Sequence, residues 1–258
     1  MTIVGSHRKN GNTAQIVGLI EEELQAAAAE AGDALEIETV YLGRRELGMC
    51  RGCRTCFDQG EEACPLQDDL LALRASMQAA DGLLVATPVY VDDVSGTVKN
   101  WIDRLAFVCH RPEFAGKSAF LVATVGIGPT SHTLRTLRMA LMSWGYHIVG
   151  QAGFKMGARM AREETVARYG QRAEGLGRQF YRAIRQRKYA NPSFLSLMTF
   201  KIQQRSWHLA AKDSVDYAYW HSQGWTDPDR EYYIEHEASR AKIACARLAG
   251  AVLARFVT

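Results

Sequence analysis

Residues 2–13 read Thr-Ile-Val-Gly-Ser-His-Arg-Lys-Asn-Gly-Asn-Thr and join a short apolar run to a helical pattern from Ala14 to about Ala31. The pattern predicts a strand, a polar loop and a helix. Such a loop suits a phosphate, because its hydroxyls, amides and cations surround the positive end of the helix. No Gly-Lys-Ser/Thr stands at Walker spacing, which argues against an ATPase or GTPase. The alternative is an ordinary helix start with Asn12 or Thr13 as the N-cap.

The same alternation continues along the chain. Further strands are expected near residues 35–41, 82–86, 119–123 and 146–154, and further helices near residues 68–80, 95–108, 133–144 and 161–188. Five β-α units predict an α/β fold, a parallel sheet with helices on both faces. We expect one domain over residues 1–190 and a helical extension without strands over residues 191–258. The Trp and Tyr residues of this extension predict a covered surface, against either the chain's own core or a second subunit.

Composition limits the class of protein. The 258 residues are 47% hydrophobic and 23% charged, which is typical of a globular chain. A net charge of +3 does not favour nucleic acid as a partner, although residues 151–205 hold 12 Lys and Arg against 3 Asp and Glu. That belt is either a solvated helix face or a surface for nucleic acid or an anionic membrane. Since no apolar run reaches about 18 residues and no export signal begins the chain, we expect a cytoplasmic protein without a membrane partner.

Two more loops follow predicted strands, and in an open α/β sheet ligands bind beyond the carboxyl ends of the strands. The third strand is expected to stop at Thr87-Pro88, so that residues 87–90 form a rigid turn beside which a flat heterocycle could lie. The fourth strand ends in Thr-Val-Gly-Ile-Gly at residues 124–128, where two glycines allow a ligand to approach the backbone. Alone, this partial Gly-x-Gly is a weak signal that an ordinary turn explains equally well.

Taken in order, the three loops resemble the flavodoxin-like NAD(P)H-dependent FMN reductase family. The motifs are residues 5–13, Thr-Pro-Val-Tyr at 87–90 with Ser-Gly-Thr-Val-Lys-Asn-Trp-Ile-Asp-Arg at 95–104, and residues 124–128. The resemblance covers about residues 1–155 and implies a doubly wound, five-stranded sheet of order 2-1-3-4-5. It implies that the FMN phosphate is held by Ser6, Arg8, Asn12 and Thr13. It places along the isoalloxazine ring Pro88, Val89, Tyr90, Gly126 and Gly128. Family members usually have more residues before Gly-Ser, so the first strand is expected to be short.

A loop without periodicity, residues 43–67, holds four of the six cysteines, and we call it the cysteine loop. Its spacing is Cys50-x2-Cys53-x2-Cys56-x7-Cys64. Three thiols at this spacing suit three corners of a cubane, whereas structural zinc more often joins two separated Cys-x2-Cys pairs. The spacing resembles the iron–sulfur flavoprotein branch of the same family. A [4Fe-4S] cluster, a zinc or vestigial thiol site and a redox-active thiol pair all remain open, and Cys109 and Cys245 are expected to be buried small hydrophobes.

The function implied by the resemblance is an FMN-dependent oxidoreductase that takes hydride from NADH or NADPH, with flavin chemistry and no protein nucleophile. A [4Fe-4S] cluster would pass electrons singly to a small-molecule or ferredoxin-type acceptor. The resemblance also suggests a homodimer or homotetramer. The alternative is an electron carrier that shuttles between partner proteins without using a pyridine nucleotide.

Overall fold

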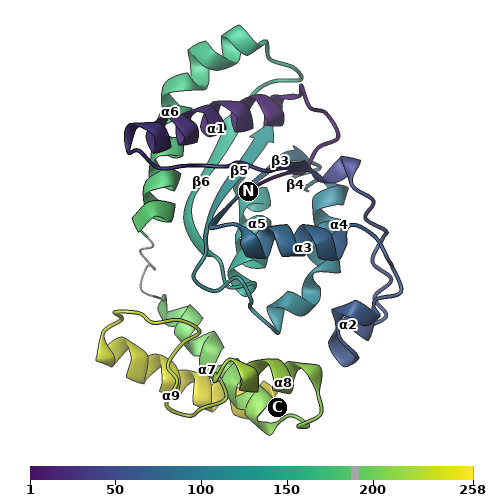
Figure 1. The fold of residues 1–258 in the computed structure, drawn as a ribbon, viewed down its shortest axis with the longest axis vertical. Coiled ribbons are helices and arrows are strands. Elements are labelled where there is room, and N and C mark those ends of the chain that lie inside the picture. Colours follow the sequence, from purple (N-terminus) through teal and green to yellow (C-terminus); the bar gives the residue numbers. More distant parts are fainter. Residues whose placement is uncertain (187–191, 258) are drawn as a thin grey trace.

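A central parallel sheet organises the first part of the chain (Figure 1). The computed structural model describes residues 1–186 and 192–257. The parallel strands follow the order β2-β1-β3-β5-β6. Their bounds are β1 (Thr2–Val4), β2 (Thr39–Tyr41), β3 (Gly82–Tyr90), β5 (Ser118–Val125) and β6 (His147–Lys155). Counted along the chain, these five strands have the order 2-1-3-4-5 that the sequence predicted.

The structure corrects the sequence in three details of this sheet. A sixth strand, β4 (Asp93–Val94), pairs antiparallel with the end of β3, and its two residues are too few to show a period. β3 does not stop at Thr87-Pro88 but continues to Tyr90, because Thr87 and Pro88 align with β5 and Val89 and Tyr90 with β4. β2 is shorter than the predicted span and keeps only Thr39–Tyr41.

Helices cover both faces of the sheet, as the β-α alternation predicted. One face packs against α1 (Asn12–Glu30) and α6 (Arg162–Gln186), and the other against α3 (Leu70–Ala79), α4 (Gly96–Arg104) and α5 (Ser131–Ser143) (Figure 1). Between them β5 is buried along its whole length. Its side chains therefore enter both apolar layers, with Leu121 in the layer under α4 and Val122 in the layer under α1.

Part of the basic belt joins these helices to one another. Arg162 and Arg178 of α6 pair with Glu22 and Glu30 of α1 at 2.6 Å each. Arg185 pairs with Asp33, just beyond α1, at 3.0 Å. These three arginines therefore join α6 to α1 and to the turn that follows it.

The C-terminal extension, described over residues 192–257, consists of α7 (Phe194–Leu209), α8 (Val215–Ser222) and α9 (Arg240–Val257), with no strand among those residues. Its aromatic residues form a cluster around Phe200, Trp220 and Trp225. The cluster is tied to the core because Trp220 Nε1 donates to the His110 carbonyl at 2.7 Å. The chain's own core thus covers part of this surface, one of the two predicted alternatives. Among the described residues, we find no helix with both the length and the apolarity needed to cross a membrane.

Candidate functional site

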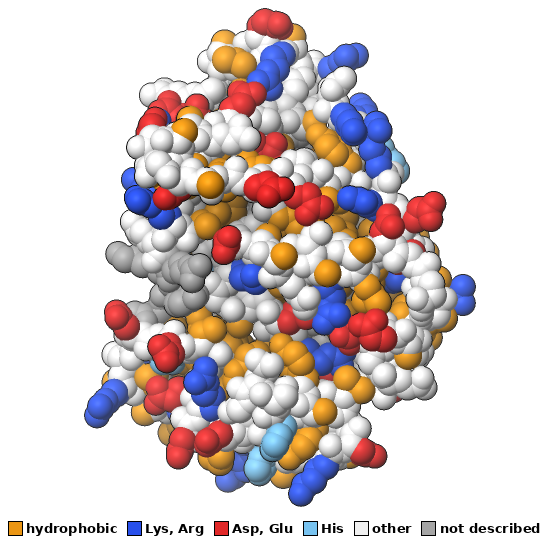
Figure 2. Space-filling view, in the orientation of Figure 1, with side chains coloured by type: hydrophobic (Ala, Val, Ile, Leu, Met, Phe, Trp, Pro, Cys, Tyr) orange, Lys and Arg blue, Asp and Glu red, His pale blue; other side chains and the backbone are white. Residues whose placement is uncertain are grey.

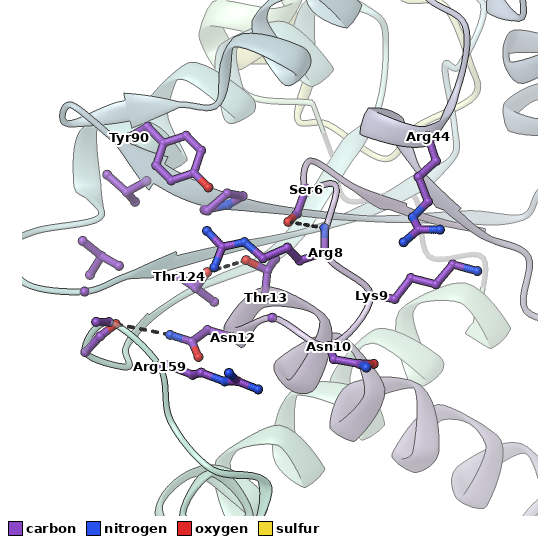
Figure 3. Close-up of a pocket in the computed structure, with 17 residues that line it drawn as sticks. Ser6, Arg8, Lys9, Asn10, Asn12, Thr13, Arg44, Tyr90, Thr124 and Arg159 are labelled. Atoms are coloured by element: carbon purple, nitrogen blue, oxygen red, sulfur yellow. Dashed lines mark hydrogen bonds between the residues drawn. The ribbon is translucent and has the colours of Figure 1, made fainter.

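A cavity of about 530 Å³ opens at the carboxyl ends of the parallel strands (Figure 3). We call it the mononucleotide pocket, and five separate segments line it: residues 6–13, Arg44, residues 88–90, residues 124–126 and residues 157–159. Each segment lies at, or just beyond, the carboxyl end of a different parallel strand. The three loops that the sequence singled out are therefore brought together, with two additions from the ends of β2 and β6.

The start of α1 forms the floor of this pocket. Gly11 is the N-cap and no side chain caps the helix, so the structure does not have the Asn12 or Thr13 cap that the alternative interpretation offered. Among the described ranges 1–186 and 192–257, no acceptor pairs with the backbone N–H groups of Asn12, Thr13 and Ala14. Thr13 and Ala14 are buried, and buried N–H groups without an acceptor are rare. An anion at this helix end would satisfy them.

Hydroxyl groups surround the same position. The Arg8 N–H donates to Ser6 Oγ at 3.1 Å, which leaves the Ser6 hydroxyl proton free to donate to a ligand. Thr13 and Thr124 share a hydrogen bond of 2.6 Å between their hydroxyls, which joins the start of α1 to the end of β5 (Figure 3). This buried bond fixes the helix start against the sheet before any ligand arrives.

Four cations line the pocket: Arg8, Lys9, Arg44 and Arg159. In the part of the chain that the structure describes, none of them forms an ion pair with a carboxylate, so their charge is available to an anionic ligand. The sequence did not single out Arg44 and Arg159. The rule that ligands lie beyond the carboxyl ends of strands could have found both, since Arg44 follows β2 and Arg159 follows β6.

Asn12 lines the pocket, but its side chain is already occupied. Its Nδ2 donates to the Gly157 carbonyl at 3.2 Å, and its Oδ1 accepts from the Met160 N–H at 3.1 Å. The side chain therefore secures the loop after β6 against α1. For Asn12 the structure leaves the backbone N–H, rather than the amide side chain, facing a possible phosphate.

The predicted ring-binding residues fall into two groups. Pro88, Val89, Tyr90 and Gly126 all line the pocket. At Gly126 a Cβ atom would lie 3.4 Å from the Gly157 carbonyl oxygen, an ordinary van der Waals distance, so the backbone packing there does not by itself require a glycine. Gly128 lies outside the pocket lining, and its φ of 104° shows that it serves the turn that follows β5.

The cysteine loop begins beside this pocket with Arg44, but its four cysteines lie elsewhere. Its helical pieces are short: η1 (Leu42–Arg44), α2 (Thr55–Asp58) and η2 (Glu61–Ala63). A second cavity, of about 140 Å³, opens here, and we call it the thiol hollow. Its lining includes all four loop cysteines, Cys50, Cys53, Cys56 and Cys64. Apolar side chains form much of the remaining wall, namely Phe57, Leu66, Leu70, Leu71 and Phe107.

Side chains of α4 hold the two ends of this loop. Asn100 Oδ1 accepts from the Cys50 N–H at 3.0 Å. One turn later the buried Arg104 pairs with Asp68 at 2.6 Å, and its other terminal nitrogen lies 3.9 Å from Cys64 Sγ. The helix begins at its N-cap Ser95, whose hydroxyl donates to the Gly5 carbonyl at 2.8 Å. A single helix therefore connects the loop after β1 with the thiol hollow.

The four thiols differ in environment. The hydrogen bond from the Thr55 hydroxyl to Cys53 Sγ, 3.3 Å long, lowers the pKa of the exposed Cys53. Burial raises the pKa of the Cys56 thiol, and the neighbouring Cys64 and Cys50 raise it further. Soft thiolate ligands of this kind suit iron–sulfur clusters and zinc, so the donor set fits either group. Over residues 1–186 and 192–257 the thiols share one hollow but are not gathered into a group of three or more at metal-binding positions.

The remaining cysteines were predicted to be buried, and this is wrong. Cys245 is exposed on α9, and Cys109 is half-buried with its sulfur 3.1 Å from the Ser143 hydroxyl. Both lie outside the lining of the thiol hollow.

A doubly wound parallel sheet with a polar first turn at a helix N-terminus and a pocket where the strand order reverses defines a flavodoxin-like protein, the class that holds FMN at this point. The sequence model of the NADPH-dependent FMN reductase family matches residues 1–159. The chain belongs to this family. It is accordingly an FMN-dependent oxidoreductase of flavodoxin-like fold.

Several characterised proteins are similar to this chain. It is 27% identical over 224 residues to an iron-sulfur flavoprotein of Archaeoglobus fulgidus, an alignment that covers 86% of this chain and 97% of that protein. It is 35% identical over 116 residues to an iron-sulfur flavoprotein of Methanosarcina thermophila, covering 45% of this chain and 56% of that protein.

Solved structures support the fold. An oxidoreductase from Corynebacterium diphtheriae superposes with a TM-score of 0.52 at 22% identity, over 72% of this chain and 96% of that one. A flavone reductase superposes with a TM-score of 0.55 at 17% identity, over 74% of this chain and 65% of that one.

Proposed function

We propose that this protein oxidises NADH or NADPH through FMN and passes the electrons through a [4Fe-4S] cluster on the cysteine loop to a small-molecule or ferredoxin-type acceptor. One observation carries the proposal: the chain forms both a pocket with unpaired helix N–H groups and a hollow lined by four thiols, and α4 contacts the loop after β1 through its N-cap Ser95 and the cysteine loop through Asn100. The first suits a phosphorylated planar cofactor, and the second suits a thiolate-bound metal centre.

In the mononucleotide pocket the phosphate of FMN would accept from the N–H groups of Thr13 and Ala14 and from the Ser6 hydroxyl. Arg8 would offset part of its charge. Tyr90 and Gly126 would border the ring, because they close the pocket at the ends of β3 and β5. When bound, FMN supplies hydride acceptance and the conversion of an electron pair into single electrons. The role of the protein is to bind, orient and partly shield the cofactor.

In the thiol hollow the ligands would be Cys50, Cys53, Cys56 and Cys64. The names of the two curated relatives support iron at this position. The buried guanidinium of Arg104 near Cys64 would offset the negative charge of a thiolate-bound centre. Cys50 and Cys53 are exposed, so the hollow has an open side through which electrons could leave to a partner.

That open side also favours a second candidate, an electron carrier that receives electrons from one protein partner and delivers them to another. The two functions share both cofactors and differ only in the electron donor. The carrier would be reduced by ferredoxin and not by a pyridine nucleotide.

We further propose that the chain acts as a homodimer or homotetramer. Large apolar side chains near the mononucleotide pocket are exposed to solvent: Val91 is fully exposed and Ile127 is 93% exposed. Contact with a second copy would cover them. Light scattering of the purified protein measures the assembly, and a monomer at micromolar concentration would refute it.

The main test is anaerobic purification followed by an absorption spectrum and by analysis of iron, acid-labile sulfide and zinc. We expect a yellow-brown protein with FMN, iron and sulfide, in which NADH or NADPH bleaches the flavin. Bleaching by reduced ferredoxin but by neither nucleotide would select the carrier. Zinc without sulfide would refute the cluster, and a colourless protein that binds no added FMN would refute the whole proposal.

A further inference from the structure

A buried arginine joins three parts of the chain that are far apart in sequence. Arg111 follows α4 and η3 (Ala106–Cys109) and is only 4% exposed. Its Nη1 donates to Asp216 of α8 at 2.9 Å. Its Nη2 donates to the Cys56 carbonyl at 2.8 Å and to Glu61 at 2.9 Å. The core, the cysteine loop and the C-terminal extension therefore meet at one guanidinium.

The charges around Arg111 are matched on every side. Glu61 also pairs with Arg74 at 2.8 Å, and Arg74 holds Glu113 with two hydrogen bonds of 2.7 Å. Asp216 accepts a second contact from His110 Nδ1 at 2.8 Å. Because buried charges are tolerated only when they are paired, removal of one partner disturbs the whole network.

Aromatic rings reinforce the same junction. The Phe57 ring, next to Cys56, lies 4.6 Å from the His110 ring, which lies 4.9 Å from the Trp207 ring of α7. Helix α2 of the loop lies beside α8 of the extension (Figure 1). Figure 2 shows hydrophobic side chains along the band where the extension meets the core. The extension therefore packs against the cysteine loop at Phe57 and along α2.

We propose that the C-terminal extension braces the cysteine loop, with Asp216 and Arg111 as positioning residues that fix Cys56 for metal ligation. The loop needs such support, because α2 has four residues and η2 has three, too few to be stable alone. Asp216 supplies the acceptor that the buried Arg111 requires. The consequence for metal binding rests on the proposed function, whereas the effect on the loop itself does not.

The contact between the C-terminal extension and the cysteine loop should affect the thiol hollow and not the mononucleotide pocket. Within the described ranges 1–186 and 192–257, the lining of the mononucleotide pocket ends at Arg159, before the extension begins. Loss of the Asp216 carboxylate should therefore loosen the cysteine loop without changing FMN affinity. This separation distinguishes a positioning role from a general loss of folding.

The test compares Asp216→Asn with Asp213→Asn, an exposed aspartate three residues earlier, in full-length, metal-free protein carrying FMN. Trypsin cleavage after the exposed Arg51 and Arg54, followed by mass spectrometry, reports how often the loop opens. Relative to the wild type, we expect cleavage to be roughly tenfold faster in Asp216→Asn and unchanged in Asp213→Asn. FMN affinity should be equal in the wild type and both variants. Cleavage of Asp216→Asn at the wild-type rate would overturn the brace.

A second variant and a second readout cover the case in which Asp216→Asn fails to fold. Glu61→Gln removes the loop carboxylate that pairs with Arg111 and leaves the contact between Asp216 and His110 intact. We expect the same faster cleavage. After reconstitution with iron and sulfide, both variants should release iron to a chelator faster than Asp213→Asn and show an altered visible circular dichroism spectrum. Faster cleavage with unchanged iron release and spectrum would overturn the ligation role, and absence of iron from every protein would instead refute the proposed cluster.

Discussion

The two cavities of this protein are built in opposite ways. The mononucleotide pocket is polar and cationic, and its walls come from five strand ends whose positions the sheet determines. The thiol hollow is mostly apolar, and its four cysteines all lie on one irregular loop that α4 and Arg111 hold from outside. A site made from strand ends is fixed by the topology of the fold, whereas a site made from one loop depends on residues that never touch its ligand.

The largest expected effect is the complete loss of one cofactor while the other stays bound. Cys53→Ser should abolish iron binding and leave FMN bound at one per chain, because the two sets of lining residues do not overlap. Iron, sulfide and flavin content of the anaerobically purified variant measure this. Cys245→Ser, which removes an exposed thiol from α9, should change neither cofactor. Parallel loss of FMN and iron from Cys53→Ser would show that the sites are not independent.

Removal of an external support of the loop should have the next largest effect. Asp68→Asn leaves the buried Arg104 without its charged partner and weakens the bond to the Gly48 N–H. We expect the free energy of unfolding to fall by about 3 kcal/mol, as for other broken buried ion pairs. Urea denaturation at pH 7 measures the loss. Asp103→Asn, which removes an exposed pair with Lys99 on the same helix, should cost less than about 1 kcal/mol.

The effect of Asp68→Asn should also depend on pH. Burial favours the protonated acid, but hydrogen bonds from Arg104, Gly48 and Leu70 outweigh it and lower the pKa of Asp68 from its ordinary value of 3.8. A lowered pKa in the folded state gives stability that is present above the unfolded value and lost as pH falls through the folded value. The difference between wild type and variant should therefore be constant above about pH 5 and shrink below 3.8. A difference that grows in acid would contradict this assignment.

A smaller effect is expected when the mononucleotide pocket loses one of its cations. Arg8→Ala should weaken FMN binding by about tenfold to thirtyfold, the lower part of the range for one charge-assisted hydrogen bond, because the helix N–H groups and the Ser6 hydroxyl remain. Flavin fluorescence titration measures the affinity. Arg45→Ala, an exposed arginine outside the lining, is the matched control. Equal weakening in both variants would show that general charge, and not the position of Arg8, sets the affinity.

The sequence predicted the mononucleotide pocket better than its surroundings, for a physical reason. Strand and helix periods reveal the sheet, and a parallel sheet necessarily brings its carboxyl ends to one edge. The three loops that line this pocket could thus be named in advance. Arg44 and Arg159 escaped notice because each follows the end of an outer strand, where no motif marks it.

The support of the cysteine loop could not be predicted in this way. The spacing of the four cysteines marks them as candidate ligands, but Asp216 lies 160 residues beyond Cys56 and shows no local pattern. Contacts of this kind depend on how the extension packs, which no period in the sequence specifies. The same limitation applies to Cys245, which was expected to be buried because an isolated free cysteine usually is, although it is exposed on α9.

The smallest expected effect concerns strain at the rim of the mononucleotide pocket. The two-residue turn between β3 and β4 places Val91 at φ 48° and Asp92 at φ 65°, and a β-branched residue is unfavourable there. Because its side chain is fully exposed, Val91→Gly should relieve the strain without losing packing and raise the free energy of unfolding by about 1 kcal/mol. Thermal unfolding of the FMN-free protein measures the gain.

Val91→Ala is the matched control for this turn, because it removes the branch but keeps the Cβ atom that positive φ disfavours. It should therefore recover only part of the gain of Val91→Gly. FMN affinity should stay unchanged in both variants, since Val91 lies outside the pocket lining. A gain in stability together with weaker FMN binding would mean that the strained turn shapes the pocket, and the pocket would then depend, like the cysteine loop, on residues that do not touch its ligand.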